Sequence, residues 1–400
     1  MVNVAILGYG VVGSGVAEVL TENAGTIDRR AEGEIRVKYI LVRRDFPDSP
    51  FQDRMVRDFS VIENDPEVDV VVEVMGGAGT AKDYTERALR AGKSVVTANK
   101  ELVAEHGCAL LHLAQEHGVS YLFEASVGGG IPIIHPLSQC LAANEIEEIT
   151  GILNGTTNYI LTRMIRGNLS FEAALGEAQE KGYAEADPTA DVEGIDACRK
   201  ICILASLAFG RHIYPRQARA EGITRITLAD VAYAEACGRR IKLLGRAIRR
   251  PDGRLWVYTA PHLVAEEDPL AGVEDVFNAI TVQGNAVGDV MFYGRGAGKR
   301  PTASAVVADV MDVARHLRNK PSLHWDEGGE DTVAPADELE SRWYVRLEDA
   351  GDLPNRAEEL FRSGAPAGER AFLMPAMSAP ALEDALKNCG RPALTLRVLD

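Results

Sequence analysis

Short apolar runs alternate with amphipathic segments over residues 1–125, and this alternation constrains the fold more than any other feature. It predicts strands at 4–7, 35–42, 68–74, 94–97 and 119–123, with helices at 12–20, 82–91 and 100–117. The valine-rich run VDVVVEV at 68–74 is typical of a strand buried on both faces of a parallel sheet. The order of elements therefore predicts an α/β domain with a doubly wound parallel sheet.

The stretch GYGVVG at 8–13 lies between the first strand and the first helix. Glycines spaced G-x-G-x-x-G allow a tight turn and a close backbone approach to a pyrophosphate, which the N-terminus of the next helix attracts. A plain glycine turn is the alternative, but the position in the alternating domain favours a Rossmann-like dinucleotide site. The candidate cofactor-binding residues are Gly8, Tyr9, Gly10, Val11, Val12 and Gly13.

The residues after the second strand bear on which nucleotide binds. NAD-binding domains usually place an acidic residue there for the ribose 2′-hydroxyl. This chain has Arg43 and Arg44, followed by Asp45. Two guanidinium groups suit a 2′-phosphate, so we expect NADP; a solvated basic turn, with Asp45 serving NAD, is the alternative.

Thr97 and Lys100 stand where the strand at 94–97 ends and the next helix begins. Ligands of open α/β sheets bind at the carboxyl ends of strands, so both residues are candidates for cofactor contacts. The helix dipole opposes a cation at a helix N-terminus, which disfavours an ordinary surface role for Lys100. A substrate carboxylate is its alternative partner.

The stretch FEASVGGGIPII at 123–134 places Glu124 and three glycines after another strand end. A carboxylate together with backbone carbonyl oxygens is a ligand set for a hard cation. An interdomain hinge explains the same residues equally well on chemistry alone.

Asp196 and Lys200 lie four residues apart in DVEGIDACRK, so one helical face should carry both. A surface ion pair of this spacing contributes only about 0.2–0.5 kcal/mol. The segment that follows, ICILASLAFG, has no polar face on which such a bridge would continue. A pair that handles a proton is the competing interpretation.

Charge and sorting signals limit the partners. The net charge of −16, without a basic cluster, disfavours nucleic acid and anionic membranes but permits a small anionic substrate at a local group of lysines. The start MVNVAILGYG does not resemble a signal peptide, and no apolar run is long enough to span a membrane. Six scattered cysteines suit a reducing compartment, so we expect a cytoplasmic location.

Several of these segments together resemble homoserine dehydrogenases. The family signature, a glycine turn followed by D-P-x-x-D, G-x-D and a lysine four residues later, is matched by AQEKGYAEADPTADVEGIDACRK at 178–200. The segments TANK, EASVGGGIPII, NGTTNYIL at 154–161 and YGRGAGKRPTASAVVAD at 293–309 also match family blocks in order and spacing.

The resemblance implies NAD(P)-dependent interconversion of L-homoserine and L-aspartate 4-semialdehyde, an oxidoreductase step in threonine and methionine biosynthesis. It implies that Lys200 donates and accepts the proton and that Lys100 is the second catalytic lysine; another cation nearby would lower the pKa of Lys200 if the two converge. The implied substrate-binding residues are Glu185, Asp196, Asp191, Gly155 and Thr156. Further implied cofactor contacts are Gly182 and Gly298, and the implied sodium site comprises Glu124 and the carbonyls of Val127, Gly129 and Ile131.

The competing functions are a related dehydrogenase for another short aldehyde or hydroxy acid, and a catalytically silent nucleotide sensor. The second would require a broken catalytic set, whereas both lysines and the carboxylates are present.

The expected domains are a dinucleotide-binding domain at 1–130 plus 301–320, an α+β substrate and dimerisation domain at 131–300, a linker at 321–340, and a small domain at 341–400. The last domain resembles a truncated, degenerate ACT regulatory domain with a helix over PNRAEELFRSG at 354–364 and one strand missing. Family resemblance implies a homodimer or a dimer of dimers.

Overall fold

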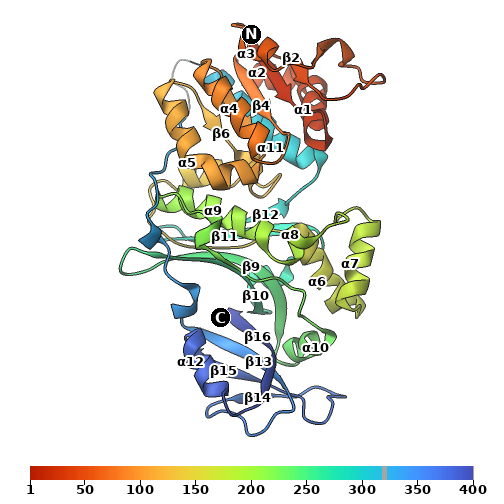
Figure 1. Cartoon of the computed structure of the whole chain (residues 1–400), viewed down its shortest axis with the longest axis vertical. Coiled ribbons are helices and arrows are strands. Elements are labelled where there is room, and N and C mark those ends of the chain that lie inside the picture. Colours follow the sequence, from red (N-terminus) through yellow and green to blue (C-terminus); the bar gives the residue numbers. More distant parts are fainter. Residues whose placement is uncertain (318–321, 400) are drawn as a thin grey trace. The chain divides into compact units, whose positions relative to one another are not determined.

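The computed structural model describes residues 1–317 and 322–399. The chain forms two compact units, each built around one β-sheet (Figure 1). Unit 1 comprises 1–145, 202–214 and 294–328, and unit 2 comprises 146–201, 215–293 and 329–400.

The sheet of unit 1 is parallel throughout and has six strands. Its order is β3 (Met55–Val56), β2 (Ile35–Leu41), β1 (Val2–Leu7), β4 (Val70–Glu73), β5 (Ser94–Thr97) and β6 (Tyr121–Leu122). The predicted doubly wound parallel sheet is therefore confirmed. Strand β4 is buried along its whole length, as its run of valines predicts.

Helices cover both faces of this sheet. They are α1 (Val11–Glu22), α2 (Ala24–Arg30), α3 (Ser60–Glu63), α4 (Gly79–Arg90), α5 (Lys100–Glu116) and α11 (Lys299–Arg315). Helices α4 and α5 lie together in front of the sheet in Figure 1, and α1 packs on α11. At Gly15 a Cβ atom would lie 2.9 Å from Cγ of Lys299, so α1 and α11 approach closely. Helix α11 also contacts β4 and β5, so this late segment of the chain belongs to the same unit as the parallel sheet.

Unit 2 contains a mixed sheet of ten strands. These are β7 (Ile146–Ile152), β8 (Arg219–Ala220), β9 (Arg239–Arg249), β10 (Leu255–Ala265), β11 (Phe277–Gly284), β12 (Gly288–Arg295), β13 (Ser341–Glu348), β14 (Glu358–Leu360), β15 (Arg370–Met377) and β16 (Arg391–Leu399). The order is β12-β11-β7-β9-β10-β16-β13-β15-β14, with β8 paired to β10. Its helices are α6 (Gly155–Gly167), α7 (Phe171–Glu180), α8 (Thr189–Val192), α10 (Leu228–Ala236), α12 (Ala379–Leu386) and the first part of α9 (Ile195–Phe209).

The C-terminal segment corrects two predictions. The helix predicted over 354–364 is wrong, because Glu358–Leu360 forms β14 and pairs antiparallel with β15. The segment therefore has four strands, and the prediction of a missing strand is wrong too. Cross-strand hydrogen bonds and the 2.7 Å ion pair between Arg370 and Glu359 outweigh the helix propensity of AEELF. Strand β16 also pairs in parallel with β10, which joins this segment to the large sheet.

The predicted linker is anchored in both units. In unit 1, the Trp325 side chain is 1% exposed and its indole N–H donates to Nδ1 of His212 at 2.9 Å. In unit 2, the buried guanidinium of Arg397 donates to the carbonyls of Ala336 and Leu339 at 2.8 and 3.2 Å. The segment therefore follows both cores closely.

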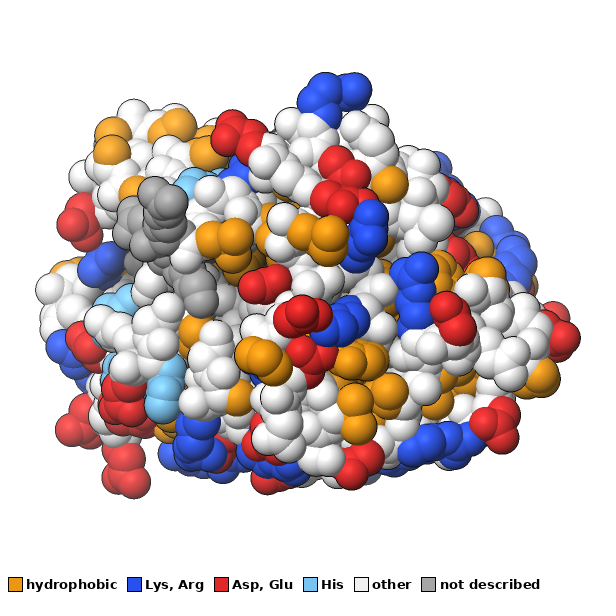
Figure 2. Space-filling model, turned by 90° about the horizontal axis from the view of Figure 1, so that it is seen from above, with side chains coloured by type: hydrophobic (Ala, Val, Ile, Leu, Met, Phe, Trp, Pro, Cys, Tyr) orange, Lys and Arg blue, Asp and Glu red, His pale blue; other side chains and the backbone are white. Residues whose placement is uncertain are grey.

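Within residues 1–317 and 322–399, no helix combines the length and apolar character required to cross a membrane. Acidic and basic side chains are interspersed on the face shown in Figure 2.

Candidate active site

The three glycines of GYGVVG have three different environments. Gly8 has a φ of +102°, which an L side chain rarely adopts. A Cβ at Gly13 would lie 2.0 Å from the carbonyl oxygen of Gly8, so only glycine permits this helix-to-strand packing. A Cβ at Gly10 would meet nothing within 4 Å, which leaves its backbone open to a ligand. These environments fit the dinucleotide interpretation.

A pocket of about 680 Å³ opens beside this turn. It contains Gly8, Tyr9 and Gly10 together with the predicted pair Arg43 and Arg44. The Tyr9 ring packs edge-on against Phe46 with centroids 5.1 Å apart, which forms one wall. The remaining predicted cofactor residues do not line this pocket; they are Val11, Val12, Gly13, Thr97, Lys100, Gly182 and Gly298.

The sequence did not single out Arg57, which also lines the pocket. Its guanidinium donates to the carbonyl of Arg43 at 2.8 Å and forms an ion pair with Asp45. Asp45, the residue that would serve NAD in the alternative interpretation, is therefore already paired with an arginine. This contact could not be predicted from the sequence, because it depends on how the segment between Asp45 and Arg57 folds.

Glu73, at the end of β4, is a second residue near the pocket that was not predicted from the sequence. It is fully buried, and it accepts hydrogen bonds from the Thr97 hydroxyl and the Met75 amide, both at 2.7 Å. Burial raises the pKa of Glu73, although these hydrogen bonds oppose the rise. The carboxyl group ties β5 to the loop that forms part of the pocket wall.

Lys100 begins α5, directly after the helix N-cap residue Asn99. The Asn99 side chain accepts from the Leu102 amide at 3.1 Å and donates to the Gly77 carbonyl at 2.7 Å. This cap fixes the start of α5 against the pocket loop, and Lys100 with it. Lys100 belongs to unit 1 and Lys200 to unit 2, so their convergence stays a prediction.

Asp196 and Lys200 form a buried pair on the first turns of α9. The ammonium Nζ lies 2.7 Å from Oδ2 of Asp196 and donates to the Leu153 carbonyl at 2.8 Å. The two side chains are only 4% and 10% exposed, respectively. The surface-bridge interpretation is therefore wrong, because packing of α9 removes both groups from solvent.

Asn154 links this pair to a second carboxylate. Its side-chain amide donates to Oδ1 of Asp191 at 2.7 Å and to Oδ2 of Asp196 at 2.8 Å. The side-chain oxygen also accepts from the Thr157 amide at 2.8 Å and so caps α6. One residue therefore joins the helix cap to two carboxylates, a role that the stretch NGTTNYIL did not reveal.

The remaining predicted substrate residues flank this group. At Gly155 a Cβ would lie 2.8 Å from the Val276 carbonyl oxygen, so a larger residue does not fit there. The Thr156 hydroxyl donates to the Tyr183 carbonyl at 2.7 Å, which holds the 183–185 turn near the start of α6. Glu185 on that turn is exposed.

The Glu124 carboxylate accepts hydrogen bonds from three backbone amides, which were not predicted from the sequence. Its Oε1 accepts from the amides of Ile133 and Ile134 at 2.6 and 2.9 Å, and its Oε2 accepts from the His135 amide at 2.7 Å. Within residues 1–317 and 322–399, Oε2 accepts this one hydrogen bond, and a carboxylate oxygen has two lone pairs. Asp309 accepts the Glu124 amide at 2.8 Å; burial and then the Glu124 charge raise its pKa well above the ordinary value.

The glycine run after Glu124 allows close packing within unit 1. A Cβ at Gly129 would lie 2.4 Å from the Gly296 carbonyl oxygen, and one at Gly130 would lie 2.7 Å from Cβ of Pro301. Loop 128–131 therefore packs directly on the turn before α11.

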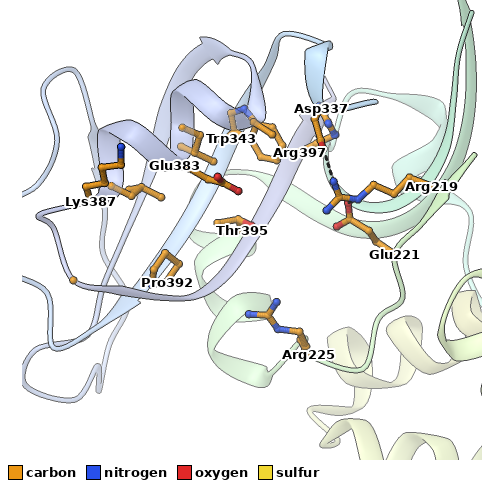
Figure 3. A pocket seen from close by; sticks show the side chains of 14 residues that line it. Arg219, Glu221, Arg225, Asp337, Trp343, Glu383, Lys387, Pro392, Thr395 and Arg397 are labelled. Carbon is orange, nitrogen blue, oxygen red and sulfur yellow. Dashed lines mark hydrogen bonds and ion pairs between the residues drawn. The ribbon is translucent and has the colours of Figure 1, made fainter. Parts of the chain in front are cut away.

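A second pocket, of about 470 Å³, lies in unit 2 beside α12 and β16 (Figure 3). Its charged side chains include Arg219, which forms an ion pair with Asp337 (Figure 3). None of the predicted substrate or cofactor residues lines it.

Comparisons with known proteins agree on one family. A model described as homoserine dehydrogenase matches residues 132–311, and one described as the homoserine dehydrogenase NAD binding domain matches residues 8–124. The chain is 44% identical over 361 residues to the homoserine dehydrogenase of Pseudomonas aeruginosa, covering 88% of this chain and 83% of that protein.

Solved structures agree as well. The crystal structure of a homoserine dehydrogenase from Thiobacillus denitrificans matches with a TM-score of 0.89 and 36% identity, covering 100% of this chain and 98% of that one. A hyperthermophilic archaeal homoserine dehydrogenase in complex with NADPH matches with a TM-score of 0.67 and 27% identity, covering 81% of this chain and 99% of the other.

Proposed function

This chain belongs to the homoserine dehydrogenase family, and from that premise we propose how its residues interconvert L-homoserine and L-aspartate 4-semialdehyde. The observation that carries the proposal is the buried Lys200–Asp196 pair, joined through Asn154 to Asp191. Oxidation of homoserine at its primary alcohol releases one proton, and reduction of the aldehyde consumes one. The site must therefore move a proton and hold an α-amino acid.

Lys200 is the proposed proton donor and acceptor. Its contacts with Asp196 and the Leu153 carbonyl both favour the ammonium form, which suits donation to the aldehyde oxygen during reduction. In the opposite direction Lys200 must first lose a proton. That step becomes easier if Asp196 turns to the substrate ammonium and Lys100 provides a second cation nearby.

The carboxylates Asp191, Asp196 and Glu185 are the proposed ligands of the substrate ammonium. Asn154 holds the first two at fixed positions, and exposed Glu185 can approach from the 183–185 turn. Gly155 and Thr156, at the N-terminus of α6, are proposed to face the substrate carboxylate, which the helix dipole attracts.

The cofactor is a nicotinamide dinucleotide bound at the GYGVVG turn, and we propose NADP over NAD. The bound cofactor supplies the hydride chemistry. The chain contributes the open backbone at Gly10 for the pyrophosphate and Arg43, Arg44 and Arg57 for a 2′-phosphate. Proposed further contacts come from Thr97, Lys100, Gly182 and Gly298.

We propose a monovalent cation, sodium, at Glu124 with the carbonyls of Val127, Gly129 and Ile131. The free capacity of Oε2 and the nearby buried carboxyl of Asp309 support it, because a cation would relieve the repulsion between two acidic groups. Its effect would be to fix the segment 124–131, which follows β6 and packs close to the start of α11. Melting temperature measured in sodium chloride and in choline chloride tests this: sodium should stabilise the wild type but not Glu124→Gln. Equal stabilisation of both proteins would contradict the site.

We also propose a homodimer, alone or paired with a second one, built through unit 2. Strand β12 is the edge strand of its sheet and is largely exposed, and Tyr293 on it is 57% exposed and stacks on Phe277. An exposed edge strand presents unpaired backbone N–H and C=O groups, with which a strand of another chain can pair. Sedimentation of the wild type and of Tyr293→Lys tests this proposal, because only the variant should dissociate.

One steady-state experiment tests the activity. The enzyme should reduce NADP with L-homoserine and show no comparable turnover with malate or other short hydroxy acids. Preferred turnover of another alcohol would identify a different dehydrogenase, and no turnover with any alcohol would favour a nucleotide sensor.

A further inference from the structure

Two histidines and an aspartate lie together on unit 1, and none of them lines the pocket beside the GYGVVG turn. His112 comes from α5, and His324 and Asp326 come from the segment after α11. One ligand atom from each lies within 4.8 Å of the others. The His112 and His324 rings have centroids 5.7 Å apart, and Nε2 of His324 is 3.2 Å from Oδ1 of Asp326.

The segment 324–326, which carries His324 and Asp326, is anchored to the core of unit 1. Between them, Trp325 is 1% exposed and fills the space above Gly107, where a Cβ would lie 2.7 Å from its ring. The Asp326 amide donates to the Gly210 carbonyl at 3.0 Å, and its carbonyl accepts from the His212 amide at 2.8 Å. The extended backbone therefore places His324 and Asp326, two residues apart, on one side. Contacts with the core therefore fix the backbone at these two residues.

The donor set selects a class of ion. Two imidazoles and one carboxylate suit Zn²⁺ and neighbouring divalent transition metals, whereas Mg²⁺ and Ca²⁺ prefer oxygen ligands. Donor atoms around tetrahedral zinc lie about 3.4 Å apart, given bonds of about 2.0–2.2 Å. The three ligand atoms here lie within 4.8 Å of one another. Rotation of the half-exposed His324 side chain can shorten these distances to those of a zinc site.

We propose that His112, His324 and Asp326 bind one divalent transition-metal ion, with Zn²⁺ as the ion that this ligand set favours. The net charge of −16 raises the local concentration of cations. The ion would clamp the segment 324–326 onto α5, the helix that begins with Lys100. It would thus be structural: it would fasten the chain to unit 1 just before residue 329, where the last segment of unit 2 begins.

Metal titration of the full chain tests this proposal independently of dehydrogenase activity. After chelator treatment, and at constant sodium, Co²⁺ should bind at one equivalent per chain with a visible d–d absorption band, and Zn²⁺ should displace it. His324→Ala and His112→Ala should each weaken Zn²⁺ binding by at least about tenfold, since even loss of a residue that supports a ligand costs that much. Zn²⁺ should raise the melting temperature of the wild type more than that of either variant.

The chain offers a matched control. His316 and Asp312 also lie 3.2 Å apart at an exposed position, but they do not belong to the group of three. His316→Ala should therefore bind Co²⁺ and Zn²⁺ like the wild type. Either of two results would overturn the proposal: no saturable uptake near one equivalent, or equal uptake by His324→Ala and the wild type. Because His324 is 53% exposed, its substitution should leave the fold intact, which circular dichroism checks.

Discussion

The ammonium of Lys200 and the carboxylate of Asp196 are 2.7 Å apart and buried together on α9. A pair of this kind on a helix surface has little effect on stability, but a buried pair strongly couples the charges of its members. Lys200 therefore keeps its carboxylate partner until another cation competes for Asp196. In the proposed mechanism the substrate ammonium is that competitor.

Lys200→Ala should lower kcat by about 10²- to 10⁴-fold, the usual contribution of a general acid, and leave NADPH binding nearly unchanged. Steady-state kinetics and NADPH fluorescence titration measure the two effects. Lys181→Ala is the matched control, because Lys181 and Glu177 are also four residues apart and 2.7 Å from each other but more exposed. Wild-type kcat in Lys200→Ala would refute the assigned role. A melting curve shows whether the unpaired Asp196 destabilises the variant.

Asn154 can be tested by a pair of substitutions that separates its two roles. Asn154→Ser keeps an N-cap for α6 but removes the amide that bridges Asp191 and Asp196; Asn154→Ala removes both. Both variants should raise KM for homoserine, and Asn154→Ala should lose about 1 kcal/mol more unfolding free energy than Asn154→Ser, which keeps the cap. Kinetics and urea denaturation provide the measurements. Normal kinetics in Asn154→Ser would show that the bridge has no role in substrate binding.

Arg57 should influence cofactor choice through two contacts. Arg57→Ala removes a cation from the proposed 2′-phosphate site and releases Asp45, so the ratio of kcat/KM for NADP to that for NAD should fall by about 10- to 100-fold. The double variant Arg43→Ala, Arg44→Ala should lower the same ratio. Arg36→Ala serves as the control, since Arg36 pairs with Glu34 outside the pocket. An unchanged ratio in both pocket variants would argue for NAD.

Glu73→Gln tests whether the buried carboxyl positions the pocket loop. The Thr97 hydroxyl donates to Oε2 of Glu73 and the Met75 amide donates to Oε1. In glutamine one of these two positions becomes an NH₂ group, which cannot accept a hydrogen bond. We expect KM for the cofactor to rise while kcat stays close to wild type, because Glu73 acts through the loop rather than on the reacting atoms. A fall in kcat at unchanged KM would contradict this positioning role.

Asp309 makes the stability of unit 1 depend on pH. Its pKa is raised on folding, so its stabilising contribution is complete below the unfolded-state pKa of about 3.9 and is lost as the pH rises through the folded-state value. Asp309→Asn keeps an acceptor for the Glu124 amide. It should gain stability relative to wild type as the pH rises from 4 to about 8. Urea denaturation without sodium measures the difference.

Asp58→Asn is a control of opposite sign. Hydrogen bonds from the Ser60 hydroxyl and amide lower the pKa of Asp58, so its contribution is present above the ordinary pKa and lost as the pH falls. Asp58→Asn should therefore lose stability, relative to wild type, at neutral pH. The same pH trend in both variants would show that Asp309 is not the cause.

Features that depend on local spacing could be predicted from the sequence. Alternating apolar runs specified the parallel sheet of unit 1, because burial of strands on both faces leaves a continuous apolar pattern. The glycine spacing specified the turn at 8–13, since Gly8 and Gly13 tolerate no side chain there. Family blocks identified the homoserine dehydrogenase family, because catalytic residues keep their order along the chain.

Contacts between polar groups that are distant in the sequence depend on the three-dimensional fold. Asn154 reaches Asp191 and Asp196, Arg57 reaches Asp45, and Asp309 accepts the amide of Glu124 from 185 residues away. It also decided that residues 358–360 form a strand, through pairing with β15 that helix propensity cannot anticipate. Helical spacing placed Asp196 and Lys200 on one face. Whether that face meets water or a neighbouring element depends on packing between distant segments, which local sequence does not encode.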